Sequence, residues 1–171
     1  TSRKEYSLNE EPYLDLYKAT YNSNKTISEA TTVDNLNTKW HDGPATITSD
    51  GSTMYFASES FNESKGFEKD KEKQLKFGKI YLYKATKEGD TWSNKKALPF
   101  NDKTYSVRNP SISKDGKTLY FSSNMPGGLG GEDIWKVSVD GDTYGTPENL
   151  GANINTEGNE SFPSIQDDGI L

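Results

Sequence analysis

Near the middle of the chain stands the run Asn109-Pro110-Ser111-Ile112-Ser113-Lys114-Asp115-Gly116-Lys117-Thr118-Leu119-Tyr120-Phe121-Ser122-Ser123. Its Asp-Gly pair lies between two segments that contain apolar residues. This is a strong short-range signal for a β-hairpin, because Gly adopts a positive φ without steric cost. Leu, Tyr and Phe in the second segment favour a strand. The run therefore predicts a strand, a tight turn and a second strand.

The same hairpin signature recurs on both sides of this run. Residues 47–58 repeat it 65 positions earlier, and residues 162–171 repeat its opening 53 positions later. The segment that follows also recurs, because Leu-Tyr-Lys-Ala-Thr stands at 16–20 and 82–86, and Asp-Ile-Trp-Lys-Val stands at 133–137. Repetition at such spacings, with four short strands in each period, favours the blades of a β-propeller.

The repeats predict the fold class and its divisions. We expect an all-β protein, a β-propeller of four-stranded antiparallel blades of which about three are present. Residues 1–42 are expected to form the C-terminal half of a blade, 43–105 a complete blade with an inserted loop at 59–79, 106–158 a second complete blade, and 159–171 the start of the next. Because propellers close with roughly 4–8 blades, we expect these residues to be part of a longer protein.

Apolar residues on both faces of the predicted strands indicate sheets that are covered on both sides. Met54 and Phe56 fall on one face of their strand and Tyr55 on the other, and Ile134 and Trp135 behave likewise. Successive strand residues point to opposite faces, so a sheet with one solvated face would alternate apolar and polar residues instead.

Composition excludes several classes of function. The chain has 171 residues, a formal net charge of −6, one His and no Cys. The acidic balance argues against nucleic acid as a partner, and the absence of Cys excludes disulfides and Cys-ligated zinc. No apolar run approaches the ~20 residues that span a bilayer, so the chain is not expected to cross a membrane.

Asp and Gly recur together at the predicted turns, as Asp50-Gly51, Asp115-Gly116 and Asp168-Gly169. A ring of carboxylates that binds cations is one interpretation. The favoured one is structural, because Asp before Gly accepts hydrogen bonds from its own turn. The glycine-rich segment 126–131 is interpreted as a connector between strands, since a phosphate-binding loop would enter a helix. A calcium site at Glu132 and Asp133 is a lesser alternative, and no cofactor is expected.

Two loops are the candidate contact surfaces, since loops on a rigid scaffold carry recognition. The segment 65–79 carries six Lys against three acidic residues and is flanked or interrupted by aromatic residues. The second loop spans 124–133. The residues proposed to contact a partner are Phe61, Lys65, Phe67, Lys73, Phe77, Met125 and Leu129.

Enzymatic activity is not expected. His41 is the only His, and no nucleophile in a strained turn accompanies it. The run from Ser113 to Thr118 superficially resembles the Asp-box of sialidases. However, it lacks the residue between Asp and Gly and the final Trp, and a sialidase also needs an arginine cluster for the substrate carboxylate. Only Arg3 and Arg108 are present.

The repeated unit resembles the TolB-type, WD-repeat-like β-propeller repeat over nearly the whole chain, from about Tyr13 to Leu171. The longer pattern in 124–135, 147–151 and 154–160 is similar to propellers of OmpA-family envelope proteins of Bacteroidota. That resemblance implies a periplasmic protein at the outer membrane, in a larger chain with a peptidoglycan-binding domain, of the kind associated with type IX secretion or gliding. It carries no catalytic residues.

These observations predict a non-enzymatic scaffold that binds other envelope proteins. Peptidoglycan would be reached through a domain that lies outside this chain. The alternative is a propeller that binds or processes glycans, for which aromatic side chains and acidic pairs would converge in a central channel.

Overall fold

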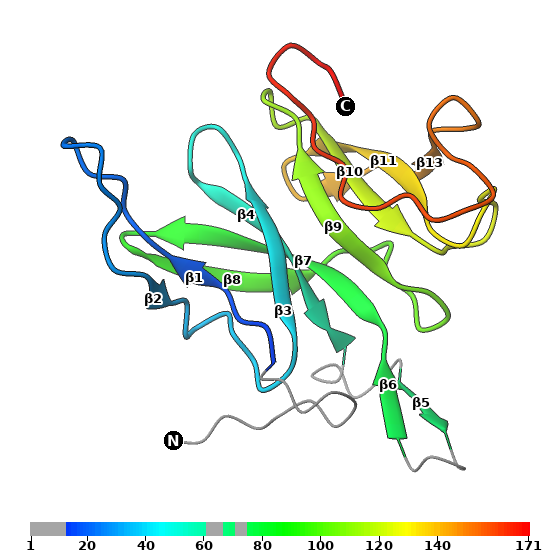
Figure 1. Cartoon of the computed structure of the whole chain (residues 1–171), viewed down its shortest axis with the longest axis horizontal. Helices are drawn as coiled ribbons and strands as arrows, with labels where there is room; N and C mark the ends of the chain where they lie inside the picture. The colour runs from blue at the N-terminus through cyan, green and yellow to red at the C-terminus, as the bar shows by residue number, and fades with distance from the viewer. Residues whose placement is uncertain (1–12, 61–66, 71–74) are drawn as a thin grey trace.

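The computed structural model describes residues 13–60, 67–70 and 75–171, and within them the chain forms strands and no helix (Figure 1). Two larger antiparallel sheets follow one another along the sequence. Several small pairings accompany them, and no sheet closes on itself. The all-β class expected from the sequence is confirmed.

The first sheet contains β3 (Asp42–Ile47), β4 (Thr53–Glu59), β7 (Ile80–Glu88) and β8 (Thr91–Ala97), hydrogen-bonded in that order. Its first hairpin closes at Gly51, where the amide donates to the Thr48 carbonyl over 2.8 Å at a φ of 72°. An L-residue avoids that φ, which is why Gly stands there. These four strands lie between residues 42 and 97, within one residue of the range 43–105 for which four strands are expected.

The second sheet repeats this order with β9 (Val107–Ile112), β10 (Thr118–Ser123) and β11 (Asp133–Asp140). Its fourth strand is interrupted. The pieces β12 (Thr143–Tyr144) and β13 (Glu148–Asn149) both pair with β11. Pro147 lies between the two pieces and has no N–H to donate to the ladder, which accounts for the break. The hairpin between β9 and β10 turns at Gly116, with a φ of 71°.

Two short strands precede the first sheet. The pair β1 (Tyr17–Lys18) and β2 (Thr31–Thr32) lies in residues 1–42, where the C-terminal half of a blade is expected. After β2 the amides of Leu36 and Asn37 both donate to the Val33 carbonyl and form a turn.

The end of the chain forms a turn but no strand. In residues 161–171 the amide of Gly169 donates to the Gln166 carbonyl over 3.0 Å, and Gln166 in turn donates to Ile170. At the C-terminus the hairpin signature therefore forms its turn, but the residues on either side of the turn do not pair as strands.

The insertion at 59–79 contains a hairpin of its own, where a loop was expected. Strands β5 (Phe67–Asp70) and β6 (Leu75–Gly78) pair and project from the body of the molecule (Figure 1). Tyr55 faces Lys84 across the first sheet, and Tyr120 faces Lys136 across the second. The two residues of the first pair are 29 positions apart in sequence, and those of the second pair are 16 apart. The difference shows that the first sheet carries an insertion of 13 residues between its second and third strands.

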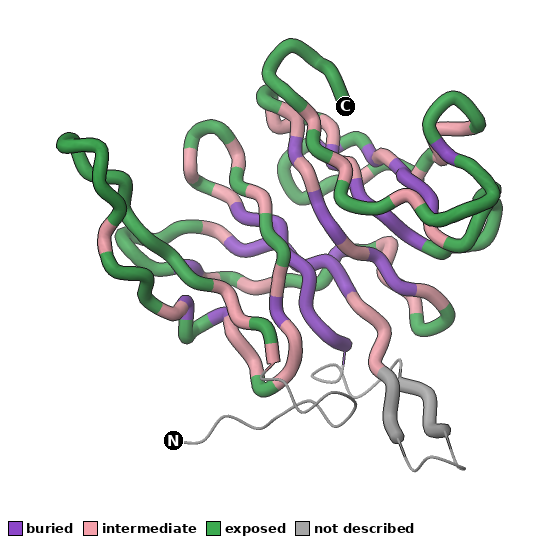
Figure 2. The backbone as a smooth tube through the Cα atoms, viewed as in Figure 1, coloured by how far each residue is buried: buried purple, intermediate pink, exposed green. Residues whose placement is uncertain are grey.

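Both faces of β4 are buried, as its sequence predicts (Figure 2). Tyr55 and Ala57 pack into a core that lies between the two large sheets and includes Leu119, Phe121 and Trp135. Met54 and Phe56 point the other way, into a second core built with the N-terminal segment. The first sheet is therefore sandwiched between two apolar cores, and burial of large side chains on both faces stabilises it.

Candidate functional site

Two loops leave the sheets at equivalent points, one after β4 and one after β10. The first loop is closed at its base, because Ser60 N donates to the Lys79 carbonyl over 2.9 Å and Lys79 N donates to Ser60 Oγ over 3.2 Å. The next residue, Ile80, donates its amide to Ser106 Oγ over 3.1 Å. The base of the inserted hairpin is thereby attached to the residue just before β9.

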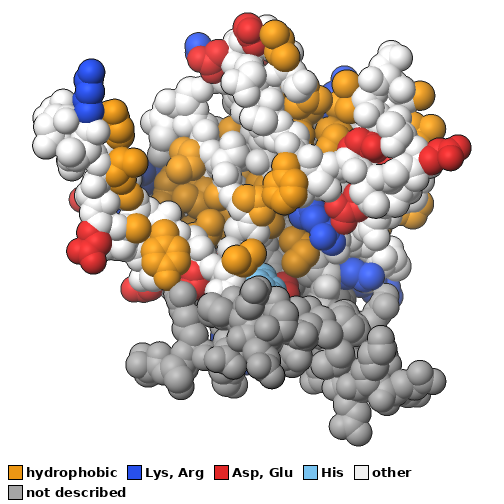
Figure 3. All heavy atoms as spheres, viewed as in Figure 1, with side chains coloured by type: hydrophobic (Ala, Val, Ile, Leu, Met, Phe, Trp, Pro, Cys, Tyr) orange, Lys and Arg blue, Asp and Glu red, His pale blue; other side chains and the backbone are white. Residues whose placement is uncertain are grey.

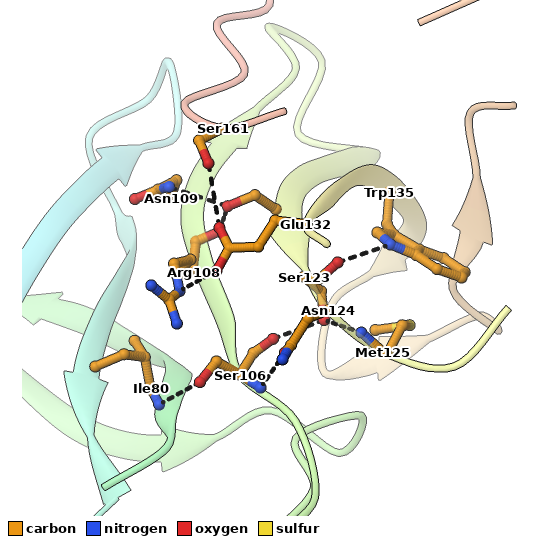
Figure 4. A network of polar contacts seen from close by, with 11 residues as sticks. Ile80, Ser106, Arg108, Asn109, Ser123, Asn124, Met125, Glu132, Trp135 and Ser161 are labelled. Atoms are coloured by element: carbon orange, nitrogen blue, oxygen red, sulfur yellow. Dashed lines mark hydrogen bonds and ion pairs between the residues drawn. The ribbon is translucent and has the colours of Figure 1, made fainter. Parts of the chain in front are cut away.

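Ser106 also holds the base of the second loop (Figure 4). Its amide donates to Asn124 Oδ1 over 2.8 Å, and its carbonyl accepts from Ser123 Oγ over 2.6 Å. Ser106 and Ser123 are buried, so these bonds are shielded from water. One buried residue therefore positions both predicted contact loops relative to one another.

Asp133 organises the glycine-rich loop from within. Its carboxylate accepts hydrogen bonds from the amides of Leu129 and Gly130 and from Asn149 Nδ2. The loop lies close against it, since a Cβ added at Gly128 would stand 2.2 Å from Asp133 Oδ2. Asp133 is buried, so these donors supply the hydrogen bonds that its carboxylate would otherwise make to water. The segment 126–131 is thus a fixed loop built around one carboxylate.

Glu132 faces the opposite way, as successive strand residues do. Its Oε1 lies 3.3 Å from Arg108 Nε, and its Oε2 accepts from Ser161 Oγ over 3.1 Å (Figure 4). The two carboxylates considered for calcium therefore have separate partners. Within residues 13–60, 67–70 and 75–171 no group of three or more His, Cys, Asp or Glu is placed to hold a metal ion.

A buried acidic pair lies near the base of the first loop. Asp42 accepts from the Thr38 amide and from Ser58 Oγ, whereas Oε2 of Glu59 has no hydrogen-bond partner among the described residues. Burial, together with the nearby Asp42 carboxylate, raises the pKa of Glu59 to about 7. Burial also lowers the pKa of His41, against the opposing effect of Asp42.

The recurrent aspartates serve their own turns. Asp50 Oδ1 accepts from the Thr48 hydroxyl over 2.6 Å and from the Ser52 amide over 3.0 Å, and these bonds lower the pKa of Asp50 to about 2. Asp115 accepts equivalent bonds within its turn. Asp168 accepts from the amide two positions on, over 3.2 Å. Each of these three carboxylates therefore accepts hydrogen bonds within its own turn.

The predicted contact residues fall into four groups. Phe61, Lys65 and Lys73 lie outside the described residues, and Phe67 and Phe77 lie on the strands of the projecting hairpin. Leu129 is 48% exposed at the tip of the glycine-rich loop. Met125 is buried in the core between the sheets, so its choice as a contact residue is corrected: its side chain packs inward against that core.

Sequence reasoning missed a repeated asparagine. Asn37, Asn101 and Asn155 each follow a fourth strand, and each side chain bonds both backbone groups of one residue at the start of a third strand. In the last repeat the amide of Ile134 donates to Asn155 Oδ1 over 2.7 Å, and Asn155 Nδ2 donates to the carbonyl of Ile134 over 3.0 Å. The signal was present, because an Asn stands at a similar place in each repeat.

Comparison of the sequence with protein-family models and with curated proteins found no match. The fold and the site together define a class of protein. It is an all-β protein of antiparallel sheets, in which buried Ser106 holds the bases of two loops. The described part of the chain contains no helix with the length and apolar character that crossing a bilayer requires.

Proposed function

We propose that the chain is the binding part of a non-enzymatic scaffold, a β-propeller of the TolB type in the bacterial envelope. Its sheets would be the blades, and its partners would be envelope proteins of a larger complex at the periplasmic side of the outer membrane. Peptidoglycan would be bound by another domain of an OmpA-family protein associated with type IX secretion or gliding. The repeated four-stranded sheets and the recurring signature of each unit support this proposal.

The junction at Ser106 is the observation that carries the binding role. Both loops are attached to Ser106 at their bases. The first is attached through Ile80, which follows it, and the second through Asn124, at which it begins. Recognition by loops is strongest where a rigid scaffold fixes their relative positions, because less entropy is lost on binding. The glycine-rich loop is further fixed by Asp133 and presents exposed Leu129 at its tip.

A glycan-processing role gains no specific support from the site. The acidic pair of Asp42 and Glu59 is buried, so a substrate could not reach these carboxylates without local opening. Arg108, the described arginine, is paired with Glu132 and would bind a sugar carboxylate only after losing that partner. We therefore base the proposal on binding.

A photo-crosslinking amino acid at Leu129 tests the proposal in cells of the source organism. The matched control places the same amino acid at Ile47, which has nearly the same exposure, 47% against 48%, at the other end of its sheet. We expect Leu129 to crosslink to one or a few envelope proteins, and Ile47 to give none of these products.

Alanine substitution of Phe61, Lys65, Phe67, Lys73, Phe77 and Leu129 should abolish the same products when the crosslinker is moved to a neighbouring loop position. Met125 stays unchanged in this variant, because it supports the core. Crosslinks that persist after these substitutions, or equal products from Ile47, would contradict a partner surface at the loops.

A further inference from the structure

Lysine contacts between successive sheets recur at one position of the repeat. Lys84 on β7 donates from Nζ to the Gly141 carbonyl over 2.9 Å and lies 2.6 Å from Asp142 Oδ1. Gly141 and Asp142 form the turn after the third strand of the next sheet. Lys84 spans from one sheet to the following one, and its side chain is only 11% exposed.

A similar contact, made to a backbone carbonyl of the equivalent turn, occurs one repeat earlier. Lys18 on β1 stands at the same place in the Leu-Tyr-Lys-Ala-Thr segment, and its Nζ lies 3.4 Å from the carbonyl of Asp90. Gly89 and Asp90 form the turn between β7 and β8, which corresponds to the turn at Gly141 and Asp142. In two successive units, the third-strand Lys thus reaches the Gly-Asp turn of the following sheet.

Lys136 is the third member of this series. It stands on β11 opposite Tyr120, as Lys84 stands opposite Tyr55. Its side chain is 42% exposed, and Nζ pairs with Glu148 of its own sheet at 3.4 Å. Within the described residues no later Gly-Asp turn lies between two strands, so this lysine has no equivalent of the turn that Lys84 binds.

Apolar side chains and a surface hollow lie on the same face of the second sheet as Lys136. Ile134 lies on the same face of β11, and beside it is a hollow of about 520 Å³, which Ile154 and Phe162 also line. In the first sheet Leu82 and Tyr55, which correspond to Ile134 and Tyr120, are buried in the core between the two sheets. The face around Ile134 and Lys136 is the corresponding face of the second sheet.

Residues 161–171 already follow the path that a next sheet would take. The amide of Ile165 donates to Ser111 Oγ over 3.1 Å, just as the amide of Ile112 donates to Thr46 Oγ1 over 3.3 Å one unit earlier. In Figure 1 this segment, drawn in red, passes over the second sheet, and Figure 3 shows hydrophobic side chains at the surface of the same region. The hydrogen bond that joins the first sheet to the second therefore has a counterpart between the second sheet and the C-terminal segment.

We propose that the outer face of the second sheet is a docking surface for a further four-stranded sheet of the same construction. Lys136 binds the Gly-Asp turn of that sheet through its backbone carbonyl and Asp carboxylate, while apolar side chains of its second and third strands fill the hollow beside Ile134. This inference rests on the repeat architecture proposed above, and concerns contacts between sheets, not the partner that the loops bind.

The test extends the full chain after Leu171 with a copy of its own residues 119–160, which keeps the strand register of the repeat and supplies the missing strands and a Gly-Asp turn. Acetylation of lysines in the native state is followed by mass spectrometry before and after the extension. We expect the acetylation rate of Lys136 to fall to the rate of Lys84 in the same molecule. Lys96, whose side chain is 64% exposed, is the reactive reference.

A second extension carries Asp142→Ala within the copied turn and should restore part of the reactivity of Lys136. Unchanged reactivity of Lys136 in the first extension, with Lys84 still protected, would overturn the proposal. The unextended chain provides an independent check: Lys84→Ala should lower the midpoint of urea unfolding and Lys136→Ala should not. Equal effects of these two substitutions would also overturn it, whereas loss of the loop crosslinks alone would refute only the binding role.

Discussion

At the scale of single residues, Glu59 is the most perturbed carboxyl group of the site. Its pKa of about 7 lies above the ordinary value of 4.5, because the side chain is 7% exposed and Asp42 is close. A raised folded-state pKa means that the folded protein holds this proton more tightly than the unfolded chain. The corresponding stability is present below pH 4.5 and is lost as the pH rises towards 7.

Glu59→Gln removes this titration and leaves a neutral group of the same shape. We expect the variant to be more stable than the parent by about 1–3 kcal/mol at pH 8, with a smaller difference at pH 4. Urea unfolding at a series of pH values measures this. The exposed Glu88→Gln serves as control. Parallel stability curves for the Glu59 variant and the parent would show that the Glu59 proton does not contribute.

At the scale of elements, the glycine-rich loop depends on close approach to Asp133. A Cβ at Gly128 would stand 2.2 Å from Asp133 Oδ2, so Gly128→Ala forces the carboxylate away from the amides that it binds. We expect a loss of about 1–3 kcal/mol in the free energy of unfolding. Gly158→Ala is the matched control, because its Cβ would meet Thr156 Oγ1 at 3.2 Å, which a small shift relieves.

Hydrogen exchange would locate the effect of Gly128→Ala. The amides of Leu129 and Gly130 donate to Asp133, so they should lose protection in this variant and keep it in Gly158→Ala. Retained protection of both amides in Gly128→Ala would mean that the loop does not need the close contact, and that Asp133 is not its organising residue.

The hairpins could be predicted from sequence because their signals are local. Asp-Gly at 50–51 and 115–116 sets the turn, and the consecutive apolar residues of β4 predict that both of its faces are buried. The bonds of Asn155 to Ile134 could not be predicted in the same way, because they join residues 21 positions apart. Such contacts depend on how the fourth strand returns, which no short pattern specifies.

The site was only partly predictable for the same reason. Leu129 is exposed as a loop residue should be, but Met125 turns inward to the core. The Ser106 junction joins residues 26 and 18 positions away, so its role follows from the packing of one sheet on the next. An isolated Ser before a strand gives no such signal. Burial of Glu59 was equally hidden, because Glu at a strand end is usually solvated.

At the scale of the whole molecule, the two sheets share one core, and the N-terminal segment shares another with the first sheet. Sheets linked in this way resemble repeat arrays, in which the stability of each unit depends on its interface with its neighbour. The contact of Ile112 with Thr46 and that of Ile165 with Ser111 repeat the same interface. A substitution that destabilises one sheet should therefore also lower the stability of the sheet before it.

Phe121→Ala tests this dependence. Phe121 lies on β10, is fully buried in the core between the sheets and stacks on Phe100 with ring centres 5.1 Å apart. Its truncation should cost about 3–5 kcal/mol. Because Tyr55 and Leu82 belong to the same core, we expect faster hydrogen exchange in β4 and β7 as well as in β10. Leu129→Ala, which truncates an exposed side chain outside both cores, should leave exchange in all three strands unchanged. Loss of protection confined to β9, β10 and β11 would instead mean that each sheet is stable without its neighbour, and the array would then behave as separate units joined by a flexible chain.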